Sequence, residues 1–247
     1  MTVPHTARVW NYWLGGTDNL PADRALGDEI AKAFPVIVDI ARADRAVLGR
    51  VVRHLEGEAG VRQFLDVGSG LPTAGNTHEL APASRVVYVD IDPHVRDQAR
   101  ALLGEVPFVL ADVRDTATIV EAAGRTLDLA RPVAVILSGV LAHLPGAAEA
   151  RAAAQRLMAA TAPGSYLVVV DGADTNAELN DVMRIWNETA HPPYAMRSPA
   201  EIRAYFDGLE LIEPGLVDVT RWRPDTEAER PLDNLVGVGR KRARDAA

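Results

Sequence analysis

Residues 63–80 read QFLDVGSGLPTAGNTHEL, and this stretch decides the fold class of the chain. The apolar run at 64–67 predicts a buried strand, and Gly68 and Gly70 predict a tight loop after it. Pro72 fits the first turn of a helix, where its missing N–H costs nothing. A strand, a glycine loop and a helix start bring backbone N–H groups up to a nucleotide-like ligand. Because Gly-x-Gly also occurs in ordinary turns, the rest of the chain must decide what the loop holds.

Apolar runs and helix-compatible segments alternate from Val61 onward, and the apolar runs are RQFLDV, RVVYVD, PFVLAD, PVAVILSG and SYLVVVDG. Short runs that are apolar on both faces are typical of parallel strands covered by helices. The alternation therefore predicts an α/β protein with a doubly wound, Rossmann-like sheet. Near the end, LELIEPGLVDV and NLVGVGRK lack a crossover helix between them, which predicts an antiparallel pair at one sheet edge.

Two helices precede this sheet, in the segments PADRALGDEIAKAF and VDIARADRAVLGRVVRHLEGE. Both have apolar residues at three-to-four spacing, and the first opens with Pro and Asp. We expect residues 1–58 to form an N-terminal helical cap that belongs to the same domain as the core over residues 59–247.

The amino-acid composition limits the kinds of partner that we expect this protein to bind. The 247 residues are 48% hydrophobic and 24% charged, and no apolar run approaches the ~20 residues that span a bilayer. The net charge of -8 repels polyphosphate, so neither a nucleic acid nor a membrane is an expected partner. Without cysteine or a secretory signal, we expect a cytoplasmic protein with no metal site. The sequence does not indicate the oligomeric state.

Polar residues end successive strands, and in an open α/β sheet the ligand lies beyond those ends. Asp90 follows the glycine loop by about 20 positions, where a carboxylate accepts hydrogen bonds from ribose hydroxyls. Its alternative is a capping role for the helix at Pro93. Asp112, with Val113 beside it, suits an adenine amino group, and its alternative is a turn role. Ser138 ends the fourth strand.

The position of Asp66 distinguishes between two kinds of adenosine-containing ligand. A carboxylate two residues before Gly68 would repel a pyrophosphate but would favour an ammonium and a sulfonium. The third glycine of the dinucleotide fingerprint is also absent. Both features favour S-adenosylmethionine over NAD as the ligand. The product of S-adenosylmethionine after methyl transfer would be S-adenosylhomocysteine.

These motifs resemble those of class I S-adenosylmethionine-dependent methyltransferases, and in detail an actinobacterial methyltransferase-like family formerly of unknown function. The resemblance covers nearly the whole chain through ARVWNYWLGGTDNLPADR, QFLDVGSGLPTAGNTHE, RVVYVDIDP, LADVRD, RPVAVILSGVLAHLP, APGSYLVV and GLELIEPGLVDVTRWRP. It implies a seven-stranded sheet with one antiparallel strand and a cofactor pocket at the strand ends. The expected cofactor contacts are Tyr12, Gly16, Asp66, Gly68, Ser69, Gly70, Asp90, Ile91, Asp112, Val113 and Ser138.

Three features outside the strand ends allow a functional or a structural role. Tyr12 and Gly16 lie in WNYWLGGTDN, which predicts a lid over the cofactor; the alternative is aromatic packing on the helical cap. His143, just after the fourth strand, is the candidate general base, and packing is its alternative. HPPY at 191–194 reads as a proline turn beside the acceptor.

The prediction is a methyltransferase that acts on an unidentified small-molecule acceptor, bound between the N-terminal cap and residues 179–196. The alternative is a non-catalytic S-adenosylmethionine-binding regulatory module, because no convincing base accompanies the pocket. A nicotinamide oxidoreductase and an RNA methyltransferase rank below both.

Overall fold

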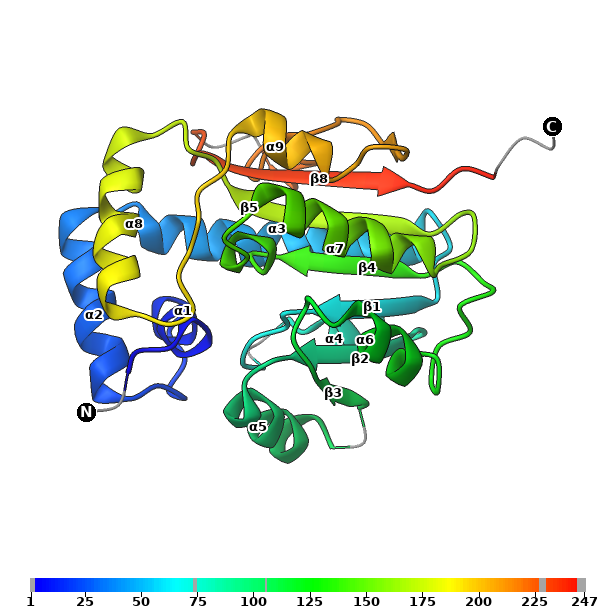
Figure 1. The fold of residues 1–247 in the computed structure, drawn as a ribbon, viewed down its shortest axis with the longest axis horizontal. Helices are drawn as coiled ribbons and strands as arrows, with labels where there is room; N and C mark the ends of the chain where they lie inside the picture. The colour runs from blue at the N-terminus through cyan, green and yellow to red at the C-terminus, as the bar shows by residue number, and fades with distance from the viewer. Residues whose placement is uncertain (1–2, 73–74, 105, 227–229, 244–247) are drawn as a thin grey trace.

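The computed structural model describes residues 3–72, 75–104, 106–226 and 230–243, which form one mixed sheet with helices on both faces (Figure 1). The sheet order is β3-β2-β1-β4-β5-β8-β6, and β7 also pairs with β8. The strands are β1 (Gln63–Val67), β2 (Arg85–Asp90), β3 (Phe108–Leu110), β4 (Ala134–Ser138), β5 (Tyr166–Gly172), β6 (Glu210–Leu211), β7 (Val217–Asp218) and β8 (Asn234–Arg240).

The sheet reverses its winding direction at β1. Strand β1 is parallel to β2 on one side and to β4 on the other, so Phe64 is in register with both Val86 and Ala134. The chain steps outward to β2 and β3, then returns to β4 and β5. Such a switch point opens a crevice at the carboxyl ends of the strands, which is where doubly wound sheets bind ligands.

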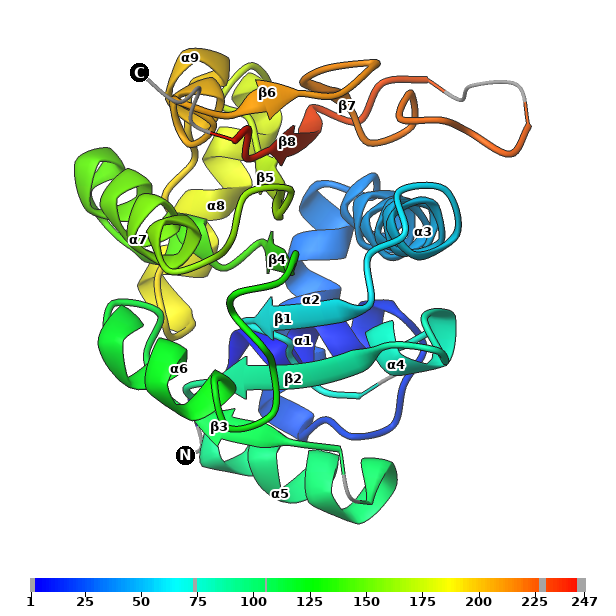
Figure 2. The same ribbon diagram turned by 90° about the vertical axis from the view of Figure 1, so that its right-hand side faces the viewer.

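Nine α-helices and one short 3₁₀ helix occupy the described part of the chain. They are α1 (Thr6–Trp13), α2 (Pro21–Ala33), α3 (Ile37–Gly57), α4 (Thr77–Leu80), α5 (Pro93–Leu103), α6 (Thr116–Ala123), η1 (Leu141–His143), α7 (Ala147–Ala159), α8 (Ala177–Thr189) and α9 (Pro199–Ala204). Figure 2 shows α3 on one face of the sheet and α6 and α7 on the other.

Side chains on the two faces of the sheet belong to two separate apolar clusters, because successive side chains of a strand point to opposite sides. In β5, Val168 and Val170 join the cluster that includes α1, α2, α3 and α8. Leu167 and Val169 join the cluster that includes α6 and α7. Both faces are therefore covered, as the sequence of β5 predicts.

Side chains at the helix starts fix where several helices begin. Asp23 accepts a hydrogen bond from the Leu20 backbone N–H at 2.8 Å, and Pro21 occupies the first turn of α2. The Asp92 carboxylate accepts from the His94 N–H at 2.8 Å at the start of α5. The cap of this helix is thus Asp92, which leaves Asp90 free of that role.

The N-terminal helices lie at the functional edge of the sheet. In Figure 1 the arrowheads of β1, β2 and β4 point toward α1, α2 and α8, which gather at the carboxyl ends of the strands. A backbone bridge joins His5 to His191, so the segment before α1 lies against the segment after α8. The helical cap thus covers the crevice at the switch point.

The structure confirms the doubly wound sheet and corrects three details of the prediction. The sheet has eight strands rather than seven, because a turn in which Gly215 N–H bonds to Ile212 splits the run at 209–219 into β6 and β7. Pro72 is not in a helix, since the next helix, α4, begins at Thr77. The segment predicted as a lid begins as a helix, because residues 10–13 are the end of α1 and only residues 14–19 lie outside it.

Candidate functional site

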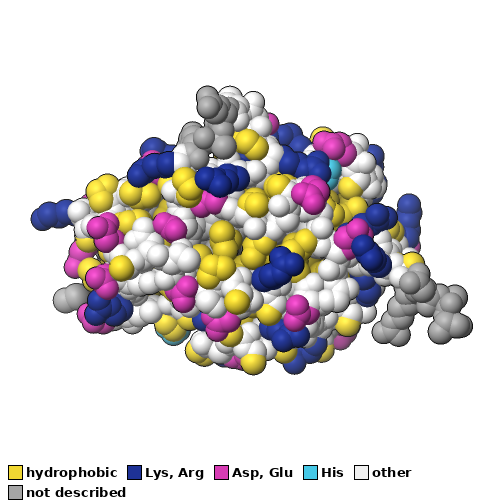
Figure 3. Space-filling model, turned by 90° about the horizontal axis from the view of Figure 1, so that it is seen from above, with side chains coloured by type: hydrophobic (Ala, Val, Ile, Leu, Met, Phe, Trp, Pro, Cys, Tyr) yellow, Lys and Arg dark blue, Asp and Glu magenta, His cyan; other side chains and the backbone are white. Residues whose placement is uncertain are grey.

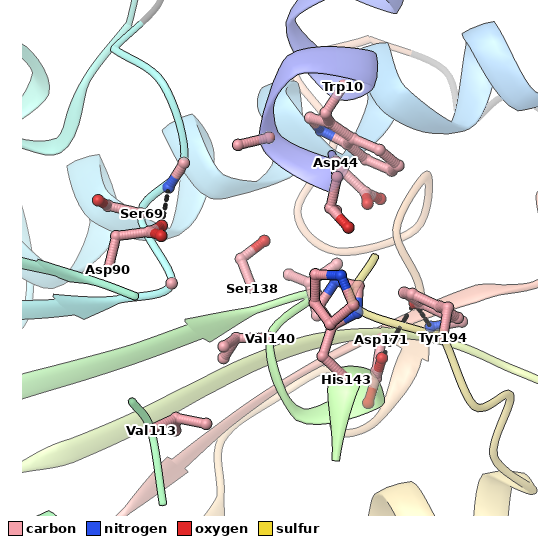
Figure 4. A pocket seen from close by; sticks show the side chains of 18 of the residues that line it. Trp10, Asp44, Ser69, Asp90, Val113, Ser138, Val140, His143, Asp171 and Tyr194 are labelled. Atoms are coloured by element: carbon pink, nitrogen blue, oxygen red, sulfur yellow. Dashed lines mark hydrogen bonds between the residues drawn. The ribbon is translucent and has the colours of Figure 1, made fainter. Parts of the chain in front are cut away.

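A cavity of about 250 Å³ lies between the carboxyl ends of the strands and the helical cap (Figure 4). Its walls come from the ends of β1, β2, β4 and β5 and from α1, α3 and α8. Ten of the twelve predicted site residues line it: Asp66, Gly68, Ser69, Gly70, Asp90, Ile91, Asp112, Val113, Ser138 and His143. The parallel topology therefore brings the predicted strand-end residues together.

The glycine loop after β1 needs its glycines for two different reasons. Gly68 and Gly70 have φ of +74° and +65°, which L side chains rarely adopt. A Cβ on Gly68 would lie 2.5 Å from the Cβ of Val140, whereas one on Gly70 would meet nothing within 4 Å. The loop therefore packs directly against the segment after β4 at Gly68 and is open at Gly70.

Asp90 ties this loop to the end of β2. Its carboxylate accepts hydrogen bonds from the backbone N–H of Gly70 at 2.9 Å and of Asp92 at 3.0 Å. The side chain is 7% exposed, and burial raises the pKa of Asp90. A carboxylate held in this way is oriented before any ligand arrives.

Asp66 lies at the end of β1 and is also buried. It accepts a hydrogen bond from the Thr77 hydroxyl at 2.6 Å, so the first residue of α4 is fixed to the strand. Burial raises the pKa of Asp66 to about 6, an effect that Thr77 and the nearby guanidinium of Arg45 oppose. Arg45, on α3, lines the same cavity. The cavity lining thus includes both a carboxylate and a guanidinium.

Asp112 behaves differently from the two buried carboxylates. Arg114 pairs with it through its guanidinium and also donates its backbone N–H at 2.8 Å. These contacts hold the pKa of Asp112 below its usual value. Close to it, Ile91 is 51% exposed and Val113 is buried, so apolar surface is available at this end of the cavity.

Tyr12 and Gly16 do not line the cavity, and their prediction as cofactor contacts is not supported by the structure. Because α1 is a helix, residues three apart share a face, so Trp10 and Trp13 line the cavity while Tyr12 points away. The Tyr12 hydroxyl donates to Asp28 of α2 at 2.7 Å. A Cβ on Gly16 would lie 2.3 Å from the side chain of Asn11, so this glycine serves the packing of the cap.

The half of the cavity away from the glycine loop contains residues that the sequence analysis did not identify. Figure 4 shows Ser69 and Asp90 on one side and Asp44, His143, Asp171 and Tyr194 on the other, with Ser138 between them. A ladder of tryptophans forms one wall: the ring centroids of Trp10 and Trp13 are 5.6 Å apart, and those of Trp13 and Trp186 are 6.1 Å apart.

Asp171 and Tyr194 hold the loop after α8 against β5. The Tyr194 hydroxyl donates to Asp171 at 3.1 Å and accepts from the Gly172 N–H at 3.2 Å. Asp171 is 1% exposed, and burial raises its pKa to about 7. The HPPY segment is therefore a wall of the cavity as well as a proline-containing loop.

His143 is fixed by this same loop. Its Nδ1 lies 2.8 Å from the carbonyl oxygen of Pro193, and since a carbonyl only accepts, Nδ1 carries the proton. Its ring meets that of Tyr194 edge to face at 5.3 Å. Burial lowers the pKa of His143 to about 4, so the imidazole is neutral at pH 7. Its Nε2 is then able to accept a hydrogen bond but is a weak base.

Three further observations concern membranes, metal ions and surface charge. None of the helices in the described ranges is long and apolar enough to cross a bilayer. Among the same residues, no cluster of His, Asp and Glu is arranged to hold a metal ion. On the face shown in Figure 3, Lys and Arg side chains alternate with Asp and Glu, so this face carries no basic stripe of the kind that tracks a nucleic acid.

Comparison with known proteins gives a consistent result. A sequence model of the S-adenosyl methyltransferase family matches residues 1–242. A solved protein of Thermobifida fusca YX, provisionally described as a methyltransferase, is 42% identical with a TM-score of 0.92, over 98% of this chain and 96% of that one. A DUF574 family protein from Streptomyces avermitilis MA-4680 is 38% identical with a TM-score of 0.91, over 97% and 98%.

More distant structures share the fold alone. The N-methyltransferase NodS of Bradyrhizobium japonicum WM9, solved in complex with S-adenosylhomocysteine, is 18% identical with a TM-score of 0.55, over 88% of this chain and 97% of that one. No curated protein matches the sequence of this chain.

Proposed function

The chain belongs to the S-adenosyl methyltransferase family, and from this premise we propose that it methylates a small molecule held between α1, α3 and α8. The observation that carries the proposal is the division of the cavity. One end has the glycine loop and three strand-end carboxylates, and the other end is walled by aromatic side chains. Such a division suits a cofactor on one side and an acceptor on the other.

The chemistry of the side chains fits S-adenosylmethionine. Its adenosine part offers ribose hydroxyls and an amino group, all of which donate to carboxylates. Its methionine part carries an ammonium and a carboxylate, which Asp66 and Arg45 complement in charge. The open space at Gly70, where a Cβ would meet nothing within 4 Å, leaves room for a ligand beside the loop.

We assign the cofactor contacts in this proposal as follows. Asp90 accepts from the ribose hydroxyls, and Asp112 accepts from the adenine amino group. The apolar side chains of Ile91 and Val113 cover the adenine. At the other end of the cofactor, Asp66 faces the ammonium, Arg45 faces the carboxylate, and the backbone of Gly68, Ser69 and Gly70 passes beside them. Ser138 lies where the cofactor and the acceptor meet.

Bound S-adenosylmethionine supplies an electrophilic methyl group, which an acceptor takes as the carbon–sulfur bond breaks and S-adenosylhomocysteine remains. The protein must position the acceptor and exclude water from it. The neutral ring of His143 is suited to orienting an acceptor through Nε2, and we propose this role for it in place of a strong general base.

Residues 1–58 belong to the same functional unit in this proposal, because α1 and α3 supply the acceptor side of the cavity. A small acceptor also agrees with the net charge of -8, which disfavours a nucleic acid substrate.

The test is transfer of a labelled methyl group from S-adenosylmethionine into a fractionated small-molecule extract. We expect a labelled product with the wild-type protein and none after heat inactivation. Binding of S-adenosylhomocysteine without any labelled product in extracts of several sources would favour the regulatory module instead.

A further inference from the structure

The acceptor end of the cavity combines an apolar wall with a buried carboxylate. The apolar wall includes Trp10, Trp13, Leu179, Met183, Trp186 and Met196. The carboxylate is that of Asp44, which points from α3 into the cavity (Figure 4). Asp44 is 7% exposed, so it is largely shielded from bulk solvent.

Asp44 lacks a cationic partner among the described residues. The side-chain amide of Asn234 on β8 donates a hydrogen bond to it, but this neutral group would leave an ionised Asp44 without a counter-ion. A buried carboxylate is ordinarily paired with a cation, because the desolvation of an isolated charge is costly. A ligand cation is the partner that would complete this site.

The groups near Asp44 on neighbouring elements of the described chain also supply no positive charge to pair with its carboxylate. Asp171 on β5 and Asp218 on β7 are both acidic, and Tyr194 is a neutral phenol. Burial and these two carboxyls raise the pKa of Asp44 to about 8, while Asn234 opposes the shift. An acidic pocket lined by indole rings attracts a cation through two interactions, the charge of the carboxylates and the cation–π attraction of the rings.

We propose that the acceptor is a primary or secondary amine with an apolar body, and that Asp44 binds its ammonium group against the tryptophan wall. This inference rests on the proposed function, since it names the substrate class of the same site. An alcohol or a carboxylic acid of the same shape would leave Asp44 without a counter-ion.

The same contact prepares the amine for methylation. An ammonium has no lone pair, so it must lose one proton before its nitrogen is nucleophilic. In the cavity an N–H bond of the ammonium breaks, an O–H bond forms on Asp44, and the electron pair stays on nitrogen. The neutral amine then donates a remaining N–H toward Nε2 of His143, which orients its lone pair.

The test is calorimetry on the full chain saturated with S-adenosylhomocysteine, using 2-phenylethylamine and n-hexylamine against 2-phenylethanol and n-hexanol. We expect each amine to bind at least about tenfold more tightly than its alcohol at pH 8, since a charge-assisted hydrogen bond is stronger than one between neutral groups. Asp44→Asn should abolish that preference. Asp39→Asn, an exposed site on the same helix, should retain it.

A second readout needs no variant. Binding of an ammonium should drive ionisation of Asp44, so the wild type should release about one proton at pH 7, seen as a dependence of the binding enthalpy on buffer. The affinity for the amine should rise at least about tenfold from pH 6 to pH 8. The alcohols should release no proton.

Each outcome separates the two proposals. Amines that bind no better than alcohols, or that fail to bind a protein saturated with S-adenosylhomocysteine, would overturn the amine inference and leave the proposed function intact. A fall in S-adenosylhomocysteine affinity in Asp44→Asn equal to the fall for amines would assign Asp44 to the cofactor, which also overturns the inference. Failure of the wild type to bind S-adenosylhomocysteine would refute the proposed function itself.

Discussion

Gly70 donates its backbone N–H to the carboxylate of Asp90 at 2.9 Å, across 20 residues of sequence. This bond connects the loop after β1 with the end of β2, so the two motifs that the sequence places apart act as one structural unit. A second contact at the same loop, between Gly68 and Val140, connects it with the segment after β4. The loop is therefore fixed on both sides of the switch point.

Gly68→Ala should damage both stability and cofactor binding. The new Cβ would lie 2.5 Å from the Cβ of Val140 at a φ of +74°, so the loop or the segment after β4 must shift. We expect a loss of about 2 kcal/mol or more in the free energy of unfolding, and at least about tenfold weaker binding of S-adenosylhomocysteine.

Gly60→Ala is the matched control, because Gly60 has a φ of +70° and open space where its Cβ would lie. It should cost about 1 kcal/mol from backbone strain alone and leave cofactor binding unchanged. Urea unfolding and calorimetry measure both quantities. Equal losses for the two variants would show that the contact with Val140 is unimportant.

Asp44→Asn should make the protein less sensitive to pH. The pKa of Asp44 is raised to about 8 in the folded protein, so between about pH 4 and pH 8 the folded state keeps a proton that the unfolded chain loses. Stability therefore falls as the pH rises through this window, by at most about 1.4 kcal/mol per pH unit for this group.

Urea unfolding at pH 5, 6, 7 and 8 measures this dependence. The wild type and Asp39→Asn should give parallel slopes, and Asp44→Asn a shallower one, because Asp66 and Asp171 still titrate. A slope that is unchanged in Asp44→Asn would contradict a buried carboxyl at this position.

Tyr194→Phe should loosen the acceptor wall. Loss of the hydroxyl removes both the bond that it donates to Asp171 at 3.1 Å and the bond that it accepts from the Gly172 N–H at 3.2 Å. We expect a cost of about 1–3 kcal/mol in the free energy of unfolding. The cavity side of the loop should then exchange its backbone amide hydrogens faster, as hydrogen exchange would record.

Tyr166→Phe provides the comparison for that change. Tyr166 is a buried residue of β5 that does not line the cavity. Its substitution should cost less than Tyr194→Phe and leave exchange in residues 190–197 as in the wild type. A smaller cost for Tyr194→Phe than for Tyr166→Phe would rule out the wall function of Tyr194.

The cofactor half of the site was predictable because the order and direction of the strands determine which residues meet there. Once the runs ending at Asp66, Asp90 and Asp112 are recognised as parallel strands, their last residues must meet at one edge of the sheet. The spacing of motifs along the chain then identifies the cavity lining without any knowledge of side-chain packing. The strand count, the path after Pro72 and the positions of Tyr12 and Gly16 outside the cavity lining differed from the prediction.

The acceptor half was not predictable in the same way. Asp44 lies within a helix, and which face of α3 meets the cavity depends on how the cap packs. Tyr194 depends on the loop after α8 folding back onto β5. Tyr12 depends on packing in the same way. Because residues 6–13 form a helix, Trp10 and Trp13 share the face that lines the cavity and Tyr12 lies on another face.

The most direct test of the central claim is a calorimetric titration of S-adenosylhomocysteine into the wild type, Asp90→Asn and Asp97→Asn. Asp97 is exposed on α5 and outside the cavity, so it controls for the change of charge. We expect micromolar binding by the wild type and by Asp97→Asn, and at least about tenfold weaker binding by Asp90→Asn. Equal binding by all three would contradict the ribose contact, and no binding by the wild type would contradict the assignment of this cavity to S-adenosylmethionine.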